Sequence, residues 1–190
     1  MPGARIEQGE RVTLRTVERA DSEFLQRAHA DPEIRYPLGT VTHMNSNQMD
    51  DHFEEFIEDE GNVSFLVCLG SAGPGHPDEG EIEAIGVVNV THVDWDRPSL
   101  AYWLVPDHHG EGYGKEAASL VVEYVFRTFD VHGIGAHAFD YNAASRGLLE
   151  SLGFTQEGRA REARFIDGEY RDAVQYGLLR REWRGREENE

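Results

Sequence analysis

The feature that most constrains the fold is a strand-like segment followed by a glycine-rich loop, a helix and a second strand. Residues 99–105 are apolar and strand-like, and the polar, glycine-rich segment that follows them at 109–116 reads HGEGYGKE. Apolar residues then recur at helical spacing over 113–129, and 134–139 reads as another strand. A strand, a helix and a strand in this order imply a right-handed crossover between parallel strands. The sequence therefore predicts a sheet that contains a parallel pair.

The other segments predict short strands and helices on both sides of this unit. Strands are expected at 12–17, 63–69 and 82–93, helices at 22–30, 45–57 and 143–152, and a final strand pair runs from 154 onward and over 170–179 around a turn at 167–168. Asp31-Pro32 is expected to end the first helix, and Gly70–Glu81 to form a mobile hairpin loop. Because short turns join the earlier strands, those strands should be antiparallel.

These elements predict one α/β domain over residues 1–183, followed by a charged, frayed tail at 184–190. The expected architecture is a single mixed, mostly antiparallel sheet with helices on both faces. The chain has 190 residues, of which 39% are hydrophobic, and this is enough to bury a core.

The charge balance narrows the possible partners. The chain has 36 acidic and 18 basic residues, a formal net charge of −18, and its basic residues are 17 arginines and one lysine, Lys115. A surface with this much negative charge repels the phosphate backbone of nucleic acids, so nucleic acid is not expected as a partner. No apolar run approaches the roughly 20 residues that cross a bilayer, and no secretory signal is seen, so a cytoplasmic protein without a membrane partner is expected. The acid excess suggests adaptation to high salt, with a solubilising surface as the alternative.

Cysteine and histidine usage argues against a metal centre. The single cysteine, Cys68, lies in an apolar run and is expected to be buried filler, and it excludes an internal disulfide. His108, His109 and Glu111 lack the spacing of a zinc site, and no third ligand lies nearby in the sequence. No metal is therefore predicted.

The glycine-rich segment has the context of an anion site. It follows a strand and opens a helix, where free main-chain N–H groups and the helix dipole favour a negative ligand. Lys115 falls just inside the helix start, where it could offset the anionic surface. A Walker loop fails at both ends, since position 109 is His and position 116 is Glu, and the spacing of Gly110, Gly112 and Gly114 is not that of a dinucleotide fingerprint. A tight strand–helix turn remains the structural alternative.

The second half of the chain resembles the GNAT family of acyl-CoA-dependent N-acetyltransferases. The central motif of that family, Gln/Arg-x-x-Gly-x-Gly/Ala, corresponds to residues 109–114, with His109 in place of Arg or Gln. More narrowly, the chain resembles the subgroup that includes the ribosomal-protein-alanine N-acetyltransferases. The matching blocks, in order between residues 11 and 183, are Leu14-Arg15 with Asp21, Tyr102-Trp103-Leu104, Gly112 to Ala117, Asn142 with Ser145, Leu152-Gly153-Phe154, Glu157-Gly158 and Asp167 to Asp172.

The resemblance implies an acyl-CoA N-acyltransferase fold, in which acetyl-CoA lies where the strands at 99–105 and 134–139 splay apart. The pantetheine would pair along Leu104 and Val105, and the amide near Val105 would polarise the thioester carbonyl. The residues implied in acetyl-CoA binding are Leu104, Val105, His109, Gly110, Glu111, Gly112, Tyr113, Gly114, Lys115 and Asn142. Asn142 could also cap the helix over 143–152. The loss of a fixed charge at His109 would weaken the pyrophosphate site.

The implied reaction is direct attack of a primary amine on the thioester in a ternary complex. Ser145 stands at the subgroup position of a general acid or thiolate partner, and the candidate bases are Asp94 and His92, with Glu83 and a water relay as alternatives. Tyr141 is a weaker candidate, since it does not stand at the position of the acid tyrosine of some relatives. The expected acceptor is a protein N-terminal amine. The alternatives are a small amine (a polyamine, amino acid or antibiotic) and a non-catalytic acyl-CoA sensor, and the chain could be a monomer or a homodimer.

Overall fold

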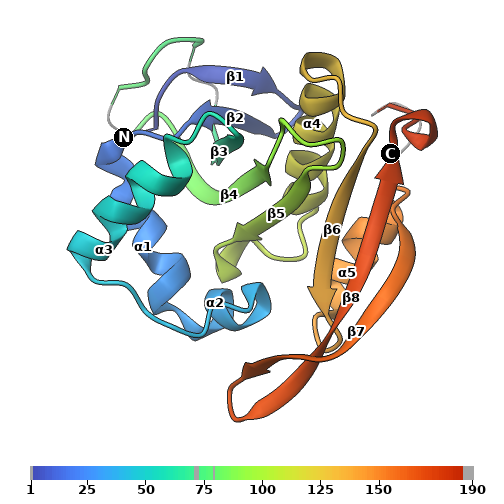
Figure 1. The fold of residues 1–190 in the computed structure, drawn as a ribbon. Coiled ribbons are helices and arrows are strands. Elements are labelled where there is room, and N and C mark those ends of the chain that lie inside the picture. Colours follow the sequence, from blue (N-terminus) through green and yellow to red (C-terminus); the bar gives the residue numbers. More distant parts are fainter. Residues whose placement is uncertain (1, 71–72, 79, 186–190) are drawn as a thin grey trace.

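The computed structural model describes residues 2–70, 73–78 and 80–185, and its chain forms a mixed sheet between two groups of helices (Figure 1). The strands are β1 (Arg5–Gln8), β2 (Val12–Thr16), β3 (Asn62–Leu69), β4 (Glu83–Thr91), β5 (Ser99–Leu104), β6 (Gly133–Phe139), β7 (Thr155–Ile166) and β8 (Glu169–Leu179). The helices are α1 (Ser22–Ala30), α2 (Pro32–Leu38), α3 (Ser46–His52), α4 (Tyr113–Thr128) and α5 (Ala143–Ser151), and a π-helical turn, Phe53–Ile57, extends α3.

The sheet has eight strands in the order β1-β2-β3-β4-β5-β6-β8-β7. Every neighbouring pair is antiparallel except β5 and β6, which run parallel and are joined by α4. The predicted crossover and the mixed, mostly antiparallel α/β fold are therefore confirmed.

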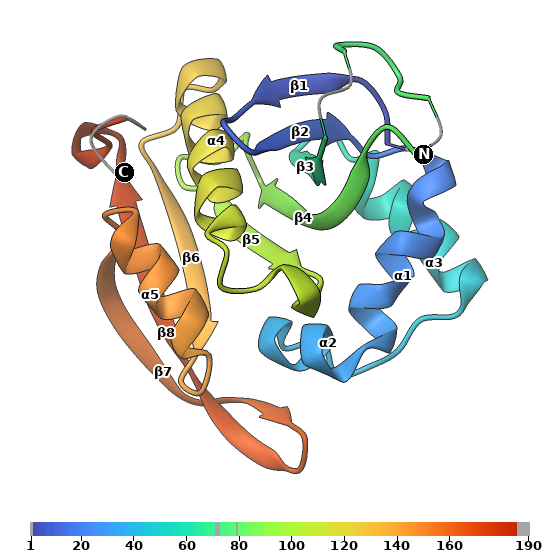
Figure 2. The ribbon, with the colours of Figure 1, turned by 180° about the vertical axis from the view of Figure 1, so that it is seen from behind.

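Helices cover both faces of the sheet. Figure 2 shows α4 and α5 on one face, where Val121 and Val125 of α4 belong to the main buried cluster with the strand residues Val67 and Val88. On the other face, Leu25 of α1 and Met49 of α3 belong to a second buried cluster, which includes Cys68. Cys68 is fully buried, as expected of a filler residue.

One helix was not expected from the sequence. Asp31-Pro32 does end α1, but the same two residues also begin α2. The Asp31 side chain accepts a hydrogen bond from the Glu33 N–H at 2.9 Å, and Pro32 fits the first helical position because its missing N–H would have no helical partner there. Gly39 ends α2 at φ 74°, with its Cα close to the Phe139 ring. The short strand β1 was also missed, because Ile6 is the one apolar residue among its four residues.

The parallel pair is short, and this opens the sheet. β5 and β6 pair only through Ser99–Gly135 and Leu100–Ala136. Beyond these residues the two strands separate, and the main chain of β5 that faces β6 has no strand partner. β6 continues to Phe139 on β8, while β7 and β8 extend past its end as a hairpin (Figure 1).

Two further observations concern the chain as a whole. Among the described residues, no helix combines the length and the apolar character that a membrane span requires. The charged tail was expected at 184–190, and its residues 186–190 lie outside the described part of the chain.

Candidate active site

A cavity of about 680 Å³ lies where β5 and β6 separate. Its walls come from β5, the glycine-rich loop, the start of α4, β6, α5 and α2. The polar side chains that line it are those of Glu33, Tyr102, His108, His109, Lys115, His137, Asn142, Ser145 and Ser151. The cavity therefore joins the predicted anion site to the unpredicted helix α2 through the gap in the sheet.

The glycine-rich loop forms one end of this cavity. Gly110 and Gly112 adopt φ values of 81° and 85°, a region that side chains with a Cβ rarely occupy. The start of α4 is tightly packed, since a Cβ at Gly114 would lie 3.2 Å from the Leu148 side chain. Lys115 lines the cavity next to this helix start. This end thus offers glycine main chain, a helix N-terminus and a cation, which suit a polyphosphate.

Arg11, which the sequence did not single out, holds this loop in place. Its guanidinium donates to the Glu111 carbonyl at 2.7 Å and to the Glu116 carboxylate at 3.1 Å, and it lies over the Tyr113 ring at 5.1 Å. Glu116 in turn accepts from the Arg11 N–H at 2.9 Å. Glu111 and Tyr113 do not line the cavity, so they contribute to the loop rather than to the cavity wall.

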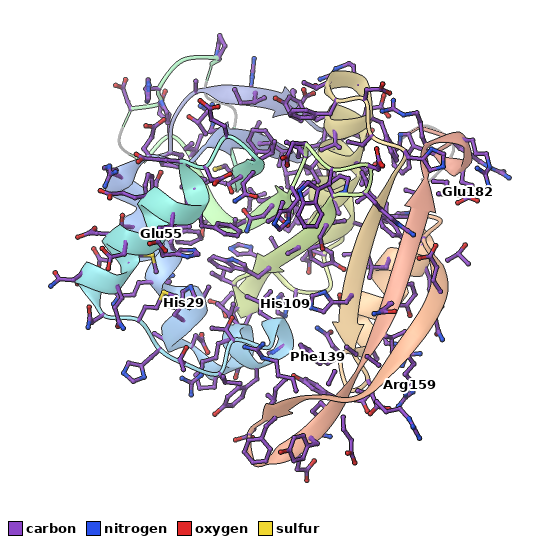
Figure 3. The ribbon with its side chains drawn as sticks, viewed as in Figure 1. His29, Glu55, His109, Phe139, Arg159 and Glu182 are labelled. Carbon is purple, nitrogen blue, oxygen red and sulfur yellow. The ribbon has the colours of Figure 1, made fainter. Side chains whose placement is uncertain are left out.

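The structure corrects the expected role of Val105. Its N–H donates to the Ile85 carbonyl at 2.8 Å, so this amide is already used within the sheet and is not available to polarise a thioester. The Leu104 carbonyl is within hydrogen-bond distance of His109 Nε2, at 3.0 Å. His109 therefore braces the loop against the end of β5, and Figure 3 shows it near the middle of the molecule.

Asn142 and Ser145 lie together at the start of α5. The Asn142 Oδ1 accepts from the Ser145 N–H at 3.0 Å, so Asn142 does cap this helix. Its amide nitrogen donates to the Pro37 carbonyl at 3.4 Å, which ties α5 to α2. Asn142 lines the cavity as well, so the capping role does not remove it from the site.

Tyr102 is a site residue that the sequence did not assign. Its hydroxyl lies 2.9 Å from Ser145 Oγ and 3.2 Å from the Ser145 carbonyl. Burial raises the pKa of Tyr102 to about 12, so the hydroxyl keeps its proton at neutral pH. Together the two hydroxyls bridge β5 and α5 inside the cavity. In the sequence, the feature that could have pointed to Tyr102 was its position on the strand before the glycine-rich loop.

The other end of the cavity is formed by α2 and the end of β6. Glu33, His137 and Phe139 line it, and Figure 3 labels Phe139 near the end of β6. Partial burial, and then the positive charge of Arg164, lower the pKa of His137. His137 is therefore neutral at pH 7 and able to accept a proton. Neither Glu33 nor His137 stands in a recognisable motif, so no local pattern pointed to either residue.

The expected bases lie elsewhere. His92 and Asp94 line a second, smaller hollow with Trp95, on the turn after β4. The ring of His92 packs on Trp95 with 4.3 Å between centroids. Neither residue lines the main cavity, and Glu83 is exposed, with its carboxylate 3.3 Å from His108 Nε2. The structure therefore does not bring these carboxylates and His92 to Ser145.

The described part of the chain was expected from its sequence to lack a metal site. No group of three or more His, Cys, Asp or Glu side chains in it could hold a metal ion.

Comparison with known proteins identifies the family to which the chain with this cavity belongs. A family model for the acetyltransferase (GNAT) domain matches residues 11–155. The chain therefore belongs to the GNAT family, and it is an acetyl-CoA-dependent N-acetyltransferase.

Individual relatives differ in the acceptor that their names give. The chain is 23% identical over 179 residues to the spermidine N(1)-acetyltransferase of Vibrio cholerae serotype O1, covering 93% of this chain and 98% of the relative. It is 36% identical over 110 residues to the [ribosomal protein uS5]-alanine N-acetyltransferase of Escherichia coli, covering 56% of each chain. The fold is similar to a crystal structure of the Vibrio cholerae spermidine N-acetyltransferase with CoA and spermine, with a TM-score of 0.80, 22% identity and coverage of 92% and 98%.

Proposed function

We propose that this acetyltransferase acts on the N-terminal amine of a protein, which attacks acetyl-CoA directly in a ternary complex. The observation that carries the proposal is the composition of the cavity end at α2. Glu33 is the one carboxylate among the described residues that line the cavity, so this end matches one ammonium group. A polyamine has several ammonium groups and would be bound best by several carboxylates along its length.

The two ends of the cavity suit different substrates. The phosphates of acetyl-CoA fit the end with Gly110, Gly112 and Lys115, because that end supplies main-chain donors and positive charge. The pantetheine fits the gap beyond the Leu100–Ala136 pair, where the main chain of β5 lacks a strand partner. The acceptor amine then enters from the α2 end. Both substrates meet near Tyr102 and Ser145.

The proton transfers follow from the same geometry. An acceptor amine is mostly protonated at pH 7 and must lose a proton before it attacks. His137, whose pKa is lowered, takes that proton directly or through a water molecule. Within the hydroxyl pair of Tyr102 and Ser145 one hydroxyl donates to the other, and the accepting hydroxyl donates its own hydrogen to the leaving thiolate; Tyr102 stays protonated because its pKa is raised.

The relatives support both kinds of acceptor, and one experiment separates them. The purified protein is incubated with acetyl-CoA and, in parallel, with N-terminal peptides, spermidine and free amino acids, and the products are identified by mass. We expect acetylation of the peptide α-amine. Acetylation of spermidine with no peptide product would overturn the proposal in favour of the small-amine alternative.

A further inference from the structure

The β7–β8 hairpin carries both arginines and carboxylates beside the acceptor end of the cavity. Its four arginines, Arg159, Arg161, Arg164 and Arg171, stand among five carboxylates, Glu157, Glu162, Asp167, Glu169 and Asp172. Figure 1 shows the hairpin extending past the end of β6 on the side of the molecule where α2 lies. The hairpin therefore has no excess of positive charge, and binding of an anion there depends on individual arginines that lack a carboxylate partner.

Two of the four arginines are directly opposite each other. Arg164 of β7 pairs with Arg171 of β8 across the ladder, so both side chains project from the same face. Like charges at such positions destabilise a hairpin. Arg171 is compensated by the Glu169 carboxylate at 2.6 Å, and Arg159 by the Asp172 carboxylate at 2.5 Å. In the described part of the chain, no carboxylate forms an ion pair with the exposed Arg164.

Contacts between aromatic side chains connect this face to the cavity. The guanidinium of Arg171 lies over the Tyr141 ring at 5.1 Å, and the Tyr141 ring stacks on Phe139 at 5.9 Å. Phe139 lines the cavity, and the Tyr141 hydroxyl donates to the main-chain carbonyl of Tyr36 in α2. The charge of Arg164 also reaches His137, whose pKa it lowers. Arg164 and Arg171 thus lie just outside the entrance through which the acceptor amine would pass.

We infer that the acceptor is an N-terminal segment with acidic side chains directly after its first residue, and that Arg164 and Arg171 bind those side chains. The inference rests on the proposed function and gives it a substrate class. Glu33 would face the α-ammonium inside the cavity, while the arginines would face carboxylates one or two residues further along the acceptor. Arg164 and Arg171 would not bind the phosphates of acetyl-CoA, because the proposed phosphate site at Lys115 lies at the other end of the cavity.

The test compares three hexapeptide acceptors that differ only at the second and third positions, which are both Asp, both Ser or both Lys. Their kcat/KM values are measured at pH 8 and saturating acetyl-CoA. We expect the acidic peptide to be the best acceptor and the basic peptide the worst. Replacing Arg164 with Gln should lower the ratio of acidic to neutral kcat/KM about fivefold, in the range of a partly exposed ion pair. Arg164→Lys should retain most of the ratio.

The control is Arg181→Gln, which removes the same charge at the opposite end of β8, next to Glu182 (Figure 3). It should leave the ratio unchanged, and melting temperatures check that each variant folds. Equal kcat/KM values for the three peptides, or a ratio that Arg164→Gln does not change, would overturn the inference while leaving peptide acetylation intact. Acetylation of spermidine but of none of the peptides would instead overturn the proposed function.

Discussion

The hydroxyl of Tyr102 lies 2.9 Å from Oγ of Ser145, and this contact joins the two elements between which the cavity passes. Tyr102 belongs to β5 and Ser145 to the first turn of α5. Ser145 alone is a weak acid, and the paired tyrosine is held protonated by burial, which raises its pKa to about 12. The pair is therefore suited to donating one hydrogen bond, strengthened by the second hydroxyl, to a thiolate rather than to complete proton transfer from serine alone.

Removing either hydroxyl should slow turnover without weakening CoA binding. We expect Tyr102→Phe and Ser145→Ala each to lower kcat by about tenfold to a hundredfold, near the lower range for acid–base groups. Because the two hydroxyls act together, the double variant should lose little more than the worse single variant. Steady-state kinetics gives kcat, and a thermal-shift titration with CoA gives the affinity.

A matched control for Tyr102→Phe is Tyr124→Phe. Tyr124 lies on α4 and packs on Phe65 outside the cavity, so loss of its hydroxyl should leave kcat unchanged. Normal kcat in both Tyr102→Phe and Ser145→Ala would remove the pair from the mechanism.

Substitution of Gly112 should weaken CoA binding, and a negatively charged side chain there should abolish it. Its φ of 85° is costly for other residues, and a Cβ there would lie 3.1 Å from the guanidinium of Arg11. Gly112→Ala should cost about 1 kcal/mol of stability from backbone strain. Gly112→Asp also places a negative charge where the phosphates are proposed to bind, so CoA should no longer raise the melting temperature.

Gly168→Ala separates backbone strain from loss of the anion site. Gly168 has a φ of 84° in the turn between β7 and β8, with open space around its Cα. The two alanine variants should lose similar stability, but only Gly112→Ala should weaken CoA binding. Equal CoA affinity in Gly112→Asp and the unmodified protein would contradict the proposed phosphate site.

The parts of the fold and site that the sequence predicted have strong local signals. The strand before the loop, the three glycines and α4 follow from periodicity and from glycine conformations, which depend on neighbouring residues alone. The capping of α5 by Asn142 and the burial of Cys68 were readable for the same reason.

The parts that were missed depend on tertiary contacts. Nothing in the local sequence shows that the Val105 N–H is used by Ile85, since this depends on the register of β4 against β5, in which Gly86 is opposite Leu104. His92 and Asp94 were placed near the acceptor by chain order, but the turn after β4 carries them to a separate hollow. His137 has an ordinary strand context, and its pKa is lowered by burial in the fold and then by the approach of a hairpin arginine, both of which depend on tertiary structure.

The buried thiol of Cys68 should be unreactive in the folded protein. Burial raises its pKa to about 12, so almost no thiolate is present at pH 8. We expect no reaction with an aromatic disulfide reagent under native conditions and one thiol per chain after denaturation, measured by absorbance. Rapid modification of the native protein would show that this face of the sheet opens on the time scale of the assay.

The pH dependence of kcat tests whether His137 is the base. A base must be neutral to accept a proton, and burial together with the charge of Arg164 lowers the pKa of His137 below its ordinary value of 6.5. At saturating neutral peptide, kcat should therefore fall only below pH 6.5 and be constant above it. His137→Gln should lower kcat about a hundredfold and abolish this acid limb.

Variants of Arg164 test whether the acid limb of the kcat profile moves in the expected direction. Replacing Arg164 with Gln removes a charge that lowers the pKa of His137, so that pKa should rise and the fall in kcat should move to higher pH. Arg164→Lys should keep the limb where it is in the unmodified protein, as should Arg181→Gln at the far end of β8. The neutral peptide is used because it lacks the carboxylates that Arg164 is proposed to bind. A limb that stays in place in Arg164→Gln, or that persists in His137→Gln, would mean that another group or a bound water accepts the proton.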